Sequence, residues 1–323
     1  MSEPARDRPA PSRPRRLGLH LGLFAATCVT TTWVGVLNAH PEINGMLSFG
    51  EILPRILDGI PYAASLMGIL LAHEMGHYVF ARAHHVPASL PFFIPVPLPP
   101  VGTMGAVIKM EGRIESRNAL VDIGASGPLA GLIVAIPVLA YGIHLSPVKP
   151  IGPGLLEGSS LLYFAIKLAV KGAILPGGGK DVVLHPIAWA GWVGLLVTMI
   201  NLMPIGQLDG GHVAFAYFGD RYGLVSRLLH RGLPLLAVLA SVYTVLELHR
   251  KAPFKLALKL GWMAGLSWVV WWLMLRLIRR ASGGQQHPPV GEEPLARGRR
   301  LLCLGMILVF FLILVPIPIR ATL

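Results

Sequence analysis

The 323-residue chain has few charged residues and almost no cysteine. Asp, Glu, Lys and Arg make up 14% of it and hydrophobic residues 54%, whereas a typical soluble domain is about 25% charged. So little polar side-chain surface cannot cover a soluble globule, which excludes an ordinary water-soluble protein. The two cysteines, Cys28 and Cys303, lie far apart in apolar runs, which excludes a disulfide framework and a cysteine-based zinc site.

Acidic residues are scarcer than basic ones, with 16 Asp and Glu against 28 Lys and Arg and a formal net charge of +12. The basic residues flank apolar runs and form no stripe with interleaved aromatic residues. We therefore expect cytoplasmic loops of a membrane protein and no nucleic-acid partner. The Arg-rich residues 1–16 predict a cytoplasmic tail, and the expected location is the plasma membrane, with the lipid bilayer around the chain.

Long apolar runs predict an all-α polytopic membrane protein with six to seven transmembrane helices. Six are expected at 17–39, 60–83, 119–143, 186–203, 232–250 and 256–278, and a seventh at 301–320. The run 158–175 is more typical of an amphipathic helix at the membrane interface, because it contains two lysines. Prolines exclude a helix over 87–100, and residues 101–111 predict a small membrane-associated β element.

The sequence His73-Glu74-Met75-Gly76-His77 lies inside the second predicted helix. Histidines four residues apart share one helical face, so both imidazoles can reach one zinc ion, with Glu74 between them as a general base. Such side chains are costly in the membrane interior, so three in one spanning helix indicate function. A satisfied polar cluster between helices is the alternative.

A third zinc ligand is expected further along the chain, because catalytic zinc usually has three protein ligands and one open position. Asp209 follows an apolar helix that Pro204 ends, and two glycines follow it. The backbone there is expected to be unwound, which at membrane depth is tolerated only where it is buried or lines a cavity. A turn residue at a helix end is the alternative for Asp209.

His-Glu-x-Gly-His in one transmembrane helix, followed by Asn-x-x-Pro and Leu-Asp-Gly in another, resembles the site-2 protease family of intramembrane zinc metalloproteases. The match covers a three-helix catalytic core at about residues 60–215. The residues that the resemblance implies are the ligands of one Zn2+ per chain, His73, His77 and Asp209, and the catalytic residues Glu74 and Asn201. Glu74 would be the base, and Asn201 would position substrate or stabilise the oxyanion. Capping of the backbone near Pro204 is the alternative for Asn201.

The resemblance also implies an organisation. After the tail 1–16, residues 17–250 would form the membrane-embedded protease core, and residues 251–323 would add C-terminal transmembrane helices around a polar linker, 282–300. Gly102–Ala106 resembles a strand that aligns substrate by β-addition, and Gly127–Gly131 resembles a helix-packing motif. His212 is either next to the metal ligands or a surface residue.

The function implied is that of a metalloendopeptidase that cuts single-span membrane proteins, as in regulated intramembrane proteolysis. The sequence leaves the oligomeric state open. A membrane metal transporter and a non-proteolytic membrane scaffold are the alternatives. A transporter usually shows repeated halves, which this chain lacks, and a scaffold has no use for Glu74.

Overall fold

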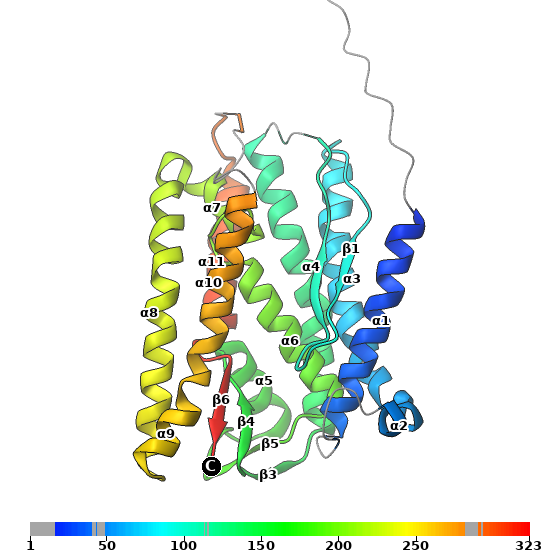
Figure 1. The fold of residues 1–323 in the computed structure, drawn as a ribbon. Coiled ribbons are helices and arrows are strands. Elements are labelled where there is room, and N and C mark those ends of the chain that lie inside the picture. The colour runs from blue at the N-terminus through cyan, green and yellow to red at the C-terminus, as the bar shows by residue number, and fades with distance from the viewer. Residues whose placement is uncertain are drawn as a thin grey trace, which may run out of the picture.

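The computed structural model describes residues 17–40, 43, 49–112, 114, 116–281, 290–291 and 293–323. The predicted tail 1–16 and residues 282–289 and 292 of the linker 282–300 lie outside the described residues. The helices are α1 (Leu17–Ala39), α2 (Phe49–Ile52), α3 (Ile60–Ala83), α4 (Arg117–Leu145), α5 (Leu161–Lys171), α6 (Pro186–Asn201), α7 (Asp209–Phe218), α8 (Tyr222–His249), α9 (Phe254–Gly261), α10 (Met263–Ala281) and α11 (Arg297–Ile313) (Figure 1). The strands are β1 (Phe92–Pro95), β2 (Thr103–Val107), β3 (Val148–Pro150), β4 (Gly154–Glu157), β5 (Lys180–Val182) and β6 (Ile319–Thr322).

Five helical stretches of the described chain are long and apolar enough to cross a membrane. They are 17–39, 49–83, 117–145, 209–249 and 254–277, and α6, with 16 residues, is a shorter apolar helix. The predicted all-α membrane fold is confirmed. Two boundaries differ from expectation. α8 begins at Tyr222, ten residues before the expected start at 232, because the segment with its basic residues is helical too. α11 ends at Ile313, and the prolines that follow lead the chain into β6.

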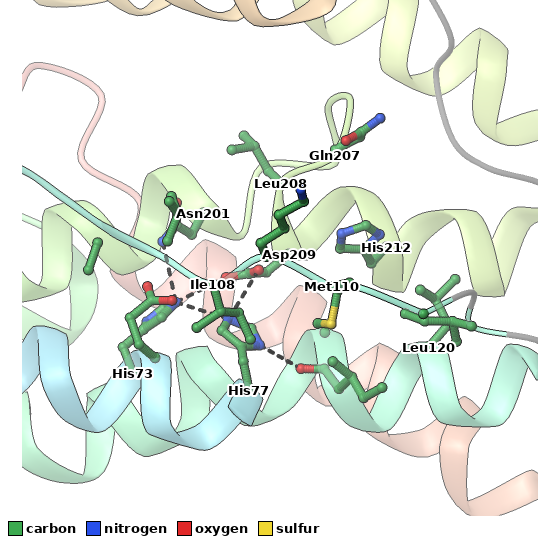
Figure 2. Close-up of a pocket in the computed structure, with 18 of the residues that line it drawn as sticks. His73, His77, Ile108, Met110, Leu120, Asn201, Gln207, Leu208, Asp209 and His212 are labelled. Atoms are coloured by element: carbon green, nitrogen blue, oxygen red, sulfur yellow. Dashed lines mark hydrogen bonds and ion pairs between the residues drawn. The ribbon is translucent and has the colours of Figure 1, made fainter. Parts of the chain in front are cut away.

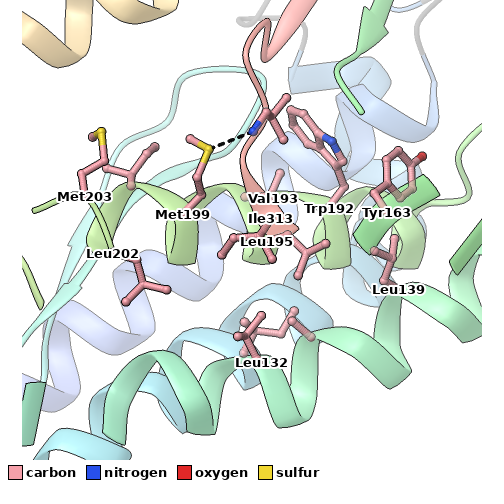
Figure 3. Close-up of a cluster of buried hydrophobic side chains, with 14 of the residues drawn as sticks. Leu132, Leu139, Tyr163, Trp192, Val193, Leu195, Met199, Leu202, Met203 and Ile313 are labelled. Carbon is pink, nitrogen blue, oxygen red and sulfur yellow. Dashed lines mark hydrogen bonds between the residues drawn. The ribbon is translucent and has the colours of Figure 1, made fainter. Parts of the chain in front are cut away.

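The centre of the fold is formed by α4, which packs against α3 on one side and α6 on the other. Glycines permit the close approach, since a Cβ at Gly191 would lie 2.7 Å from the backbone of Leu139. Figure 3 shows the apolar side chains that fill this contact, with Leu132 and Leu139 from α4 facing Trp192 and Leu195 from α6. This packing holds the three predicted catalytic helices in a fixed arrangement.

The predicted β element is an antiparallel hairpin of β1 and β2 that pairs Phe92 with Val107 and lies along α1 and α3 (Figure 1). Side chains of three helices donate hydrogen bonds to carbonyls at its tip. Tyr62 Oη bonds the carbonyl of Val101 at 2.7 Å. Asn38 Nδ2 and Trp189 Nε1 bond the carbonyl of Pro100 at 3.1 and 3.2 Å. These bonds satisfy backbone groups that would otherwise be costly inside a membrane.

Residues 146–185 form a compact unit at the opposite end of the bundle from the start of α1 (Figure 1). β3 pairs with β5, and β4 pairs with the C-terminal β6. α5 lies in the run that the sequence predicts to be an interfacial amphipathic helix, and its Lys167 is fully buried. Its Nζ lies 2.8 Å from Oδ1 of Asp181 and 3.4 Å from Oε1 of Glu157.

The helices alternate in direction as expected. The start of α1, the loop after α3 and the end of α10 lie at one end of the molecule, and residues 146–185 and α9 lie at the other (Figure 1). The basic segment 250–255, between α8 and α9, lies at the same end as residues 146–185 (Figure 1).

Candidate metal centre

Three side chains that could hold a metal ion meet where α3 faces the start of α7 (Figure 2). Nε2 of His73 lies 3.1 Å from Oδ2 of Asp209, and Nε2 of His77 lies 3.2 Å from Oδ1. The two Nε2 atoms lie 3.3 Å apart. Both histidines are buried and the Asp209 side chain is 16% exposed, so little water competes for these atoms.

The donor set of this cluster fits a divalent metal ion. Nδ1 of His77 lies 2.7 Å from the carbonyl oxygen of Ile123, which can only accept, so Nδ1 carries the proton. A neutral imidazole then directs the lone pair of Nε2 at its neighbours, His73 and Asp209. Two imidazoles and a carboxylate around one point are a zinc ligand set with room for a fourth partner.

Small residues of α4 make space for both imidazoles. A Cβ at Gly127 would overlap the ring of His77, and a Cβ at Gly131 would lie 3.2 Å from Nδ1 of His73. On α3, a Cβ at Gly76 would lie 2.5 Å from the carbonyl oxygen of Ser126. The segment 127–131 therefore packs against the imidazole rings of the metal centre. This is a more specific role than helix packing alone.

The segment between α6 and α7 is irregular, as expected around Asp209. Gly206 adopts φ +60°, a left-handed conformation that glycine tolerates at no steric cost. The hydroxyl of Tyr222 donates to the carbonyl of Gly206. A Cβ at Gly210 would overlap the carbonyl of Leu202. These close contacts fix the first residue of α7, and they direct the Asp209 carboxylate at α3.

Glu74 lines the same cavity as the three candidate ligands, and this cavity has a volume of about 510 Å³. Its side chain is buried on α3. The chain that continues from β2 forms the opposite wall and crosses in front of the centre at Ile108 and Met110 (Figure 2). Ile108 lines the cavity together with Glu74. A carboxyl group, a candidate metal centre and an extended segment thus share one enclosed space.

Of the remaining candidates, Asn201 and His212 line the cavity and His84 does not. Nδ2 of Asn201 lies 3.3 Å from Nε2 of His73, so the amide reaches the cluster. His212 lies one turn after Asp209 and lines the cavity. His84 lies outside the cavity, where its Nε2 is 3.0 Å from Oδ2 of Asp122. The place of Ile108 in the cavity wall was not predicted, because no side-chain pattern in the sequence marks it.

Comparison with known proteins agrees with this geometry. The sequence profile of Peptidase family M50 matches residues 61–228, just over half of the chain, and this range contains every candidate site residue. The chain belongs to Peptidase family M50. M50 is the site-2 protease family, so the resemblance to that family is confirmed.

Plant proteins are among the relatives of this M50 chain. "Probable zinc metalloprotease EGY1, chloroplastic" of Arabidopsis thaliana is 36% identical over 177 residues, which are 52% of this chain and 32% of the relative. "Probable zinc metalloprotease EGY2, chloroplastic" of Oryza sativa subsp. indica is 32% identical over 224 residues, 67% of this chain and 40% of the relative. EGY2 of Arabidopsis thaliana is 27% identical over 279 residues, 85% of this chain and 44% of the relative.

This M50 chain thus matches between about a third and less than half of the length of these relatives. Their names place them in chloroplasts, so the comparisons give no support to the expected plasma membrane. No solved structure matches the chain.

Proposed function

We propose that this chain is a zinc-dependent endopeptidase that hydrolyses peptide bonds of transmembrane protein substrates. The observation that carries the proposal is the convergence of His73, His77 and Asp209 next to Glu74 in one buried cavity. The names of the plant relatives support zinc and proteolysis. The helices of the chain support a substrate that lies in the bilayer.

The residues of the cavity divide the work of hydrolysis. His73, His77 and Asp209 would hold the metal. The chemistry that bound zinc supplies is Lewis acidity, which polarises a carbonyl group and lowers the pKa of water to about 7. Glu74 takes a proton from a water molecule as the oxygen of that water bonds to the carbonyl carbon of the substrate. Glu74 then returns the proton to the amine nitrogen as the carbon–nitrogen bond breaks.

Asn201 and the segment after β2 would position the substrate. The Asn201 amide reaches the cluster and can donate a hydrogen bond to the carbonyl oxygen as negative charge develops on it. The wall at residues 106–110 is extended, so it can pair with an unwound stretch of a single-span membrane protein. Cleavage of such substrates would place this chain in regulated intramembrane proteolysis.

We further propose that the end of the bundle nearer the metal centre faces the cytoplasm. Arginines are concentrated before α1 and at the end of α10, and positive charge is typical of the cytoplasmic side. An impermeant thiol reagent should then label a cysteine that replaces Ser116 only after the membrane is opened. The background would carry Cys28→Ser and Cys303→Ser, and labelling of intact cells or vesicles from outside would reverse the orientation.

The deciding experiment is Glu74→Gln. Glu74 is not a proposed ligand, so the variant should keep about one zinc per chain by elemental analysis. Cleavage of a reconstituted transmembrane substrate should fall by about 10²–10⁴, the usual contribution of a general base. A metal transporter would need the ligands but no base, and a scaffold would need neither. Cleavage at a near wild-type rate would contradict the proposed mechanism.

A further inference from the structure

A second cavity, of about 390 Å³, lies on the far side of the segment that carries Asp209. Its walls come from α7, α8, α10, α11 and residues 202–205, and no charged side chain lines it. Its volume falls within the range of small-molecule sites, about 300–1,000 Å³. None of the residues proposed for catalysis lines this cavity, so it is a separate space.

The rim of this cavity opens on the outside of the helix bundle. Phe311 is 57% exposed, Leu229 42% and Phe218 37%, although all three line the cavity. Deeper inside, Leu233 and Trp268 are buried. Because α8 and α10 belong to membrane-spanning stretches, the surroundings of this opening are lipid chains, and an apolar cavity there is filled by apolar matter.

Two arginines stand on the helix faces that line the cavity, at the end where α10 finishes and α11 begins. Arg279 follows the cavity residue Trp268 by eleven residues, or three turns, and so shares its face. Arg300 precedes the cavity residues Cys303 and Ile307 by three and seven residues, which also places it on their face. Both arginines are exposed, and within the described part of the chain neither forms an ion pair with a carboxylate.

A second group of contacts strengthens the positive end. Arg276 lies over the ring of Trp272, 5.3 Å from its centre, and Trp272 stacks with His230 of α8. Both Arg276 and Arg279 act electrostatically on His230. Positive charge is thus concentrated between α8 and α10 near the end of α10, and anionic lipid headgroups attract basic residues at the end of a spanning helix.

We propose that this cavity binds an anionic phospholipid, with one acyl chain between α8, α10 and α11 and the phosphate between Arg279 and Arg300. Guanidinium groups suit phosphate because they present paired donors. The lipid would support residues 202–205, which form its inner wall, and so would hold Asp209 in place. This last consequence rests on the proposed function, whereas lipid binding does not.

The first test counts retained lipid by native mass spectrometry of the full chain, purified from vesicles that contain phosphatidylglycerol and phosphatidylcholine. We expect one retained phosphatidylglycerol per chain. Arg279→Gln with Arg300→Gln should weaken its binding by at least about tenfold, since each basic residue near anionic lipid contributes about 1 kcal/mol. The matched control is Arg227→Gln with Arg231→Gln, which removes two exposed arginines on the other face of α8.

The second test narrows the rim without changing charge. Leu229→Trp should reduce lipid retention, whereas Leu228→Trp should not, because Leu228 is exposed on the same helix but lies outside the cavity. The proposal would be overturned if the two pairs of arginine substitutions weakened lipid binding equally. It would also be overturned if phosphatidylcholine were retained as well as phosphatidylglycerol, or if no lipid were retained. So would a transmembrane substrate that cross-links at Leu229 and displaces the lipid. Lipid retention by Glu74→Gln separates this site from the proposed catalysis, because it should be unchanged.

Discussion

The molecule contains two buried groups of polar side chains at opposite ends, and they differ in how their charge is balanced. In the unit 146–185, Lys167 lies between Glu157 and Asp181, and the hydroxyl of Tyr163 donates to Glu157 at 2.8 Å. At the other end, two imidazoles and the Asp209 carboxylate face one another, and within the described residues no Lys or Arg forms an ion pair with Asp209. The first group contains its own cation, Lys167. The second has no lysine or arginine partner within the described residues, so a metal cation could balance its carboxylate.

The largest expected effect comes from removing the ligands of the second group. His73→Ala with His77→Ala should reduce zinc from about one per chain to none and should abolish cleavage, because a single carboxylate cannot hold the ion. Elemental analysis of the purified protein gives the zinc content. His84→Ala with His85→Ala is the control, since neither residue lines the metal cavity, and it should keep the zinc. Stoichiometric zinc in the first variant would refute the assignment of the ligands.

Removing the cation of the first group should destabilise the fold. Lys167→Met leaves Glu157 and Asp181 buried without a cation, so the free energy of unfolding should fall by about 3–5 kcal/mol. Lys171→Met, four residues further along α5, is the control, because Lys171 only donates to the carbonyl of His144 at an exposed position. Its effect should stay near 1 kcal/mol. Denaturation in mixed micelles measures both, and equal losses would show that the buried charges do not stabilise the unit.

A third experiment displaces one of the candidate ligands by enlarging the residue that packs against it. Gly127→Ala adds a methyl group where the ring of His77 lies, so the imidazole must move. We expect zinc affinity to fall by about 10–100-fold, the usual effect of displacing the support of a ligand. Gly68→Ala on α3 meets no atom within 4 Å and should leave affinity unchanged. Competition with a chelator gives the affinities, and an unchanged value for Gly127→Ala would show that the helices can shift apart.

The smallest expected effect concerns pH and Glu157. Burial raises the pKa of Glu157, although Lys167 and Tyr163 oppose the increase. Stability gained from its protonated form is therefore present at low pH and lost as pH rises through the raised pKa. Glutamine has no proton to lose, so Glu157→Gln avoids this loss of stability. At neutral pH the free energy of unfolding of the variant should equal that of the wild type or exceed it by about 1 kcal/mol. The difference should vanish on acidification, and a difference that grows as pH falls would contradict the assignment.

Local patterns predicted most of the fold and most of the site. α3 was predicted at its observed bounds, because Pro61 suits a first turn and a continuous apolar run follows. The pair His73 and His77 followed from helical spacing alone. Asp209 was a candidate third ligand because of the irregular backbone around it, but no local rule joins α7 to α3, so its place beside the histidines was supported by the resemblance.

Long-range partners could not be predicted. β6 contains four residues, and its partner β4 lies more than 150 residues earlier in the chain. The burial of Lys167 could not be predicted either, because a lysine on an amphipathic helix is usually solvated. Only the fold brings Glu157 and Asp181 to it, from β4 and β5.

The β1–β2 hairpin connects three helices to the metal cavity, which has a mechanical consequence. Its tip accepts hydrogen bonds from Asn38, Tyr62 and Trp189, and the chain beyond β2 lines the cavity at Ile108. A displacement of the hairpin tip should therefore shift the cavity wall next to the metal centre. Relative movement of α1, α3 and α6 would change the position of that wall, so we expect the alignment of a substrate to depend on a fixed arrangement of these three helices.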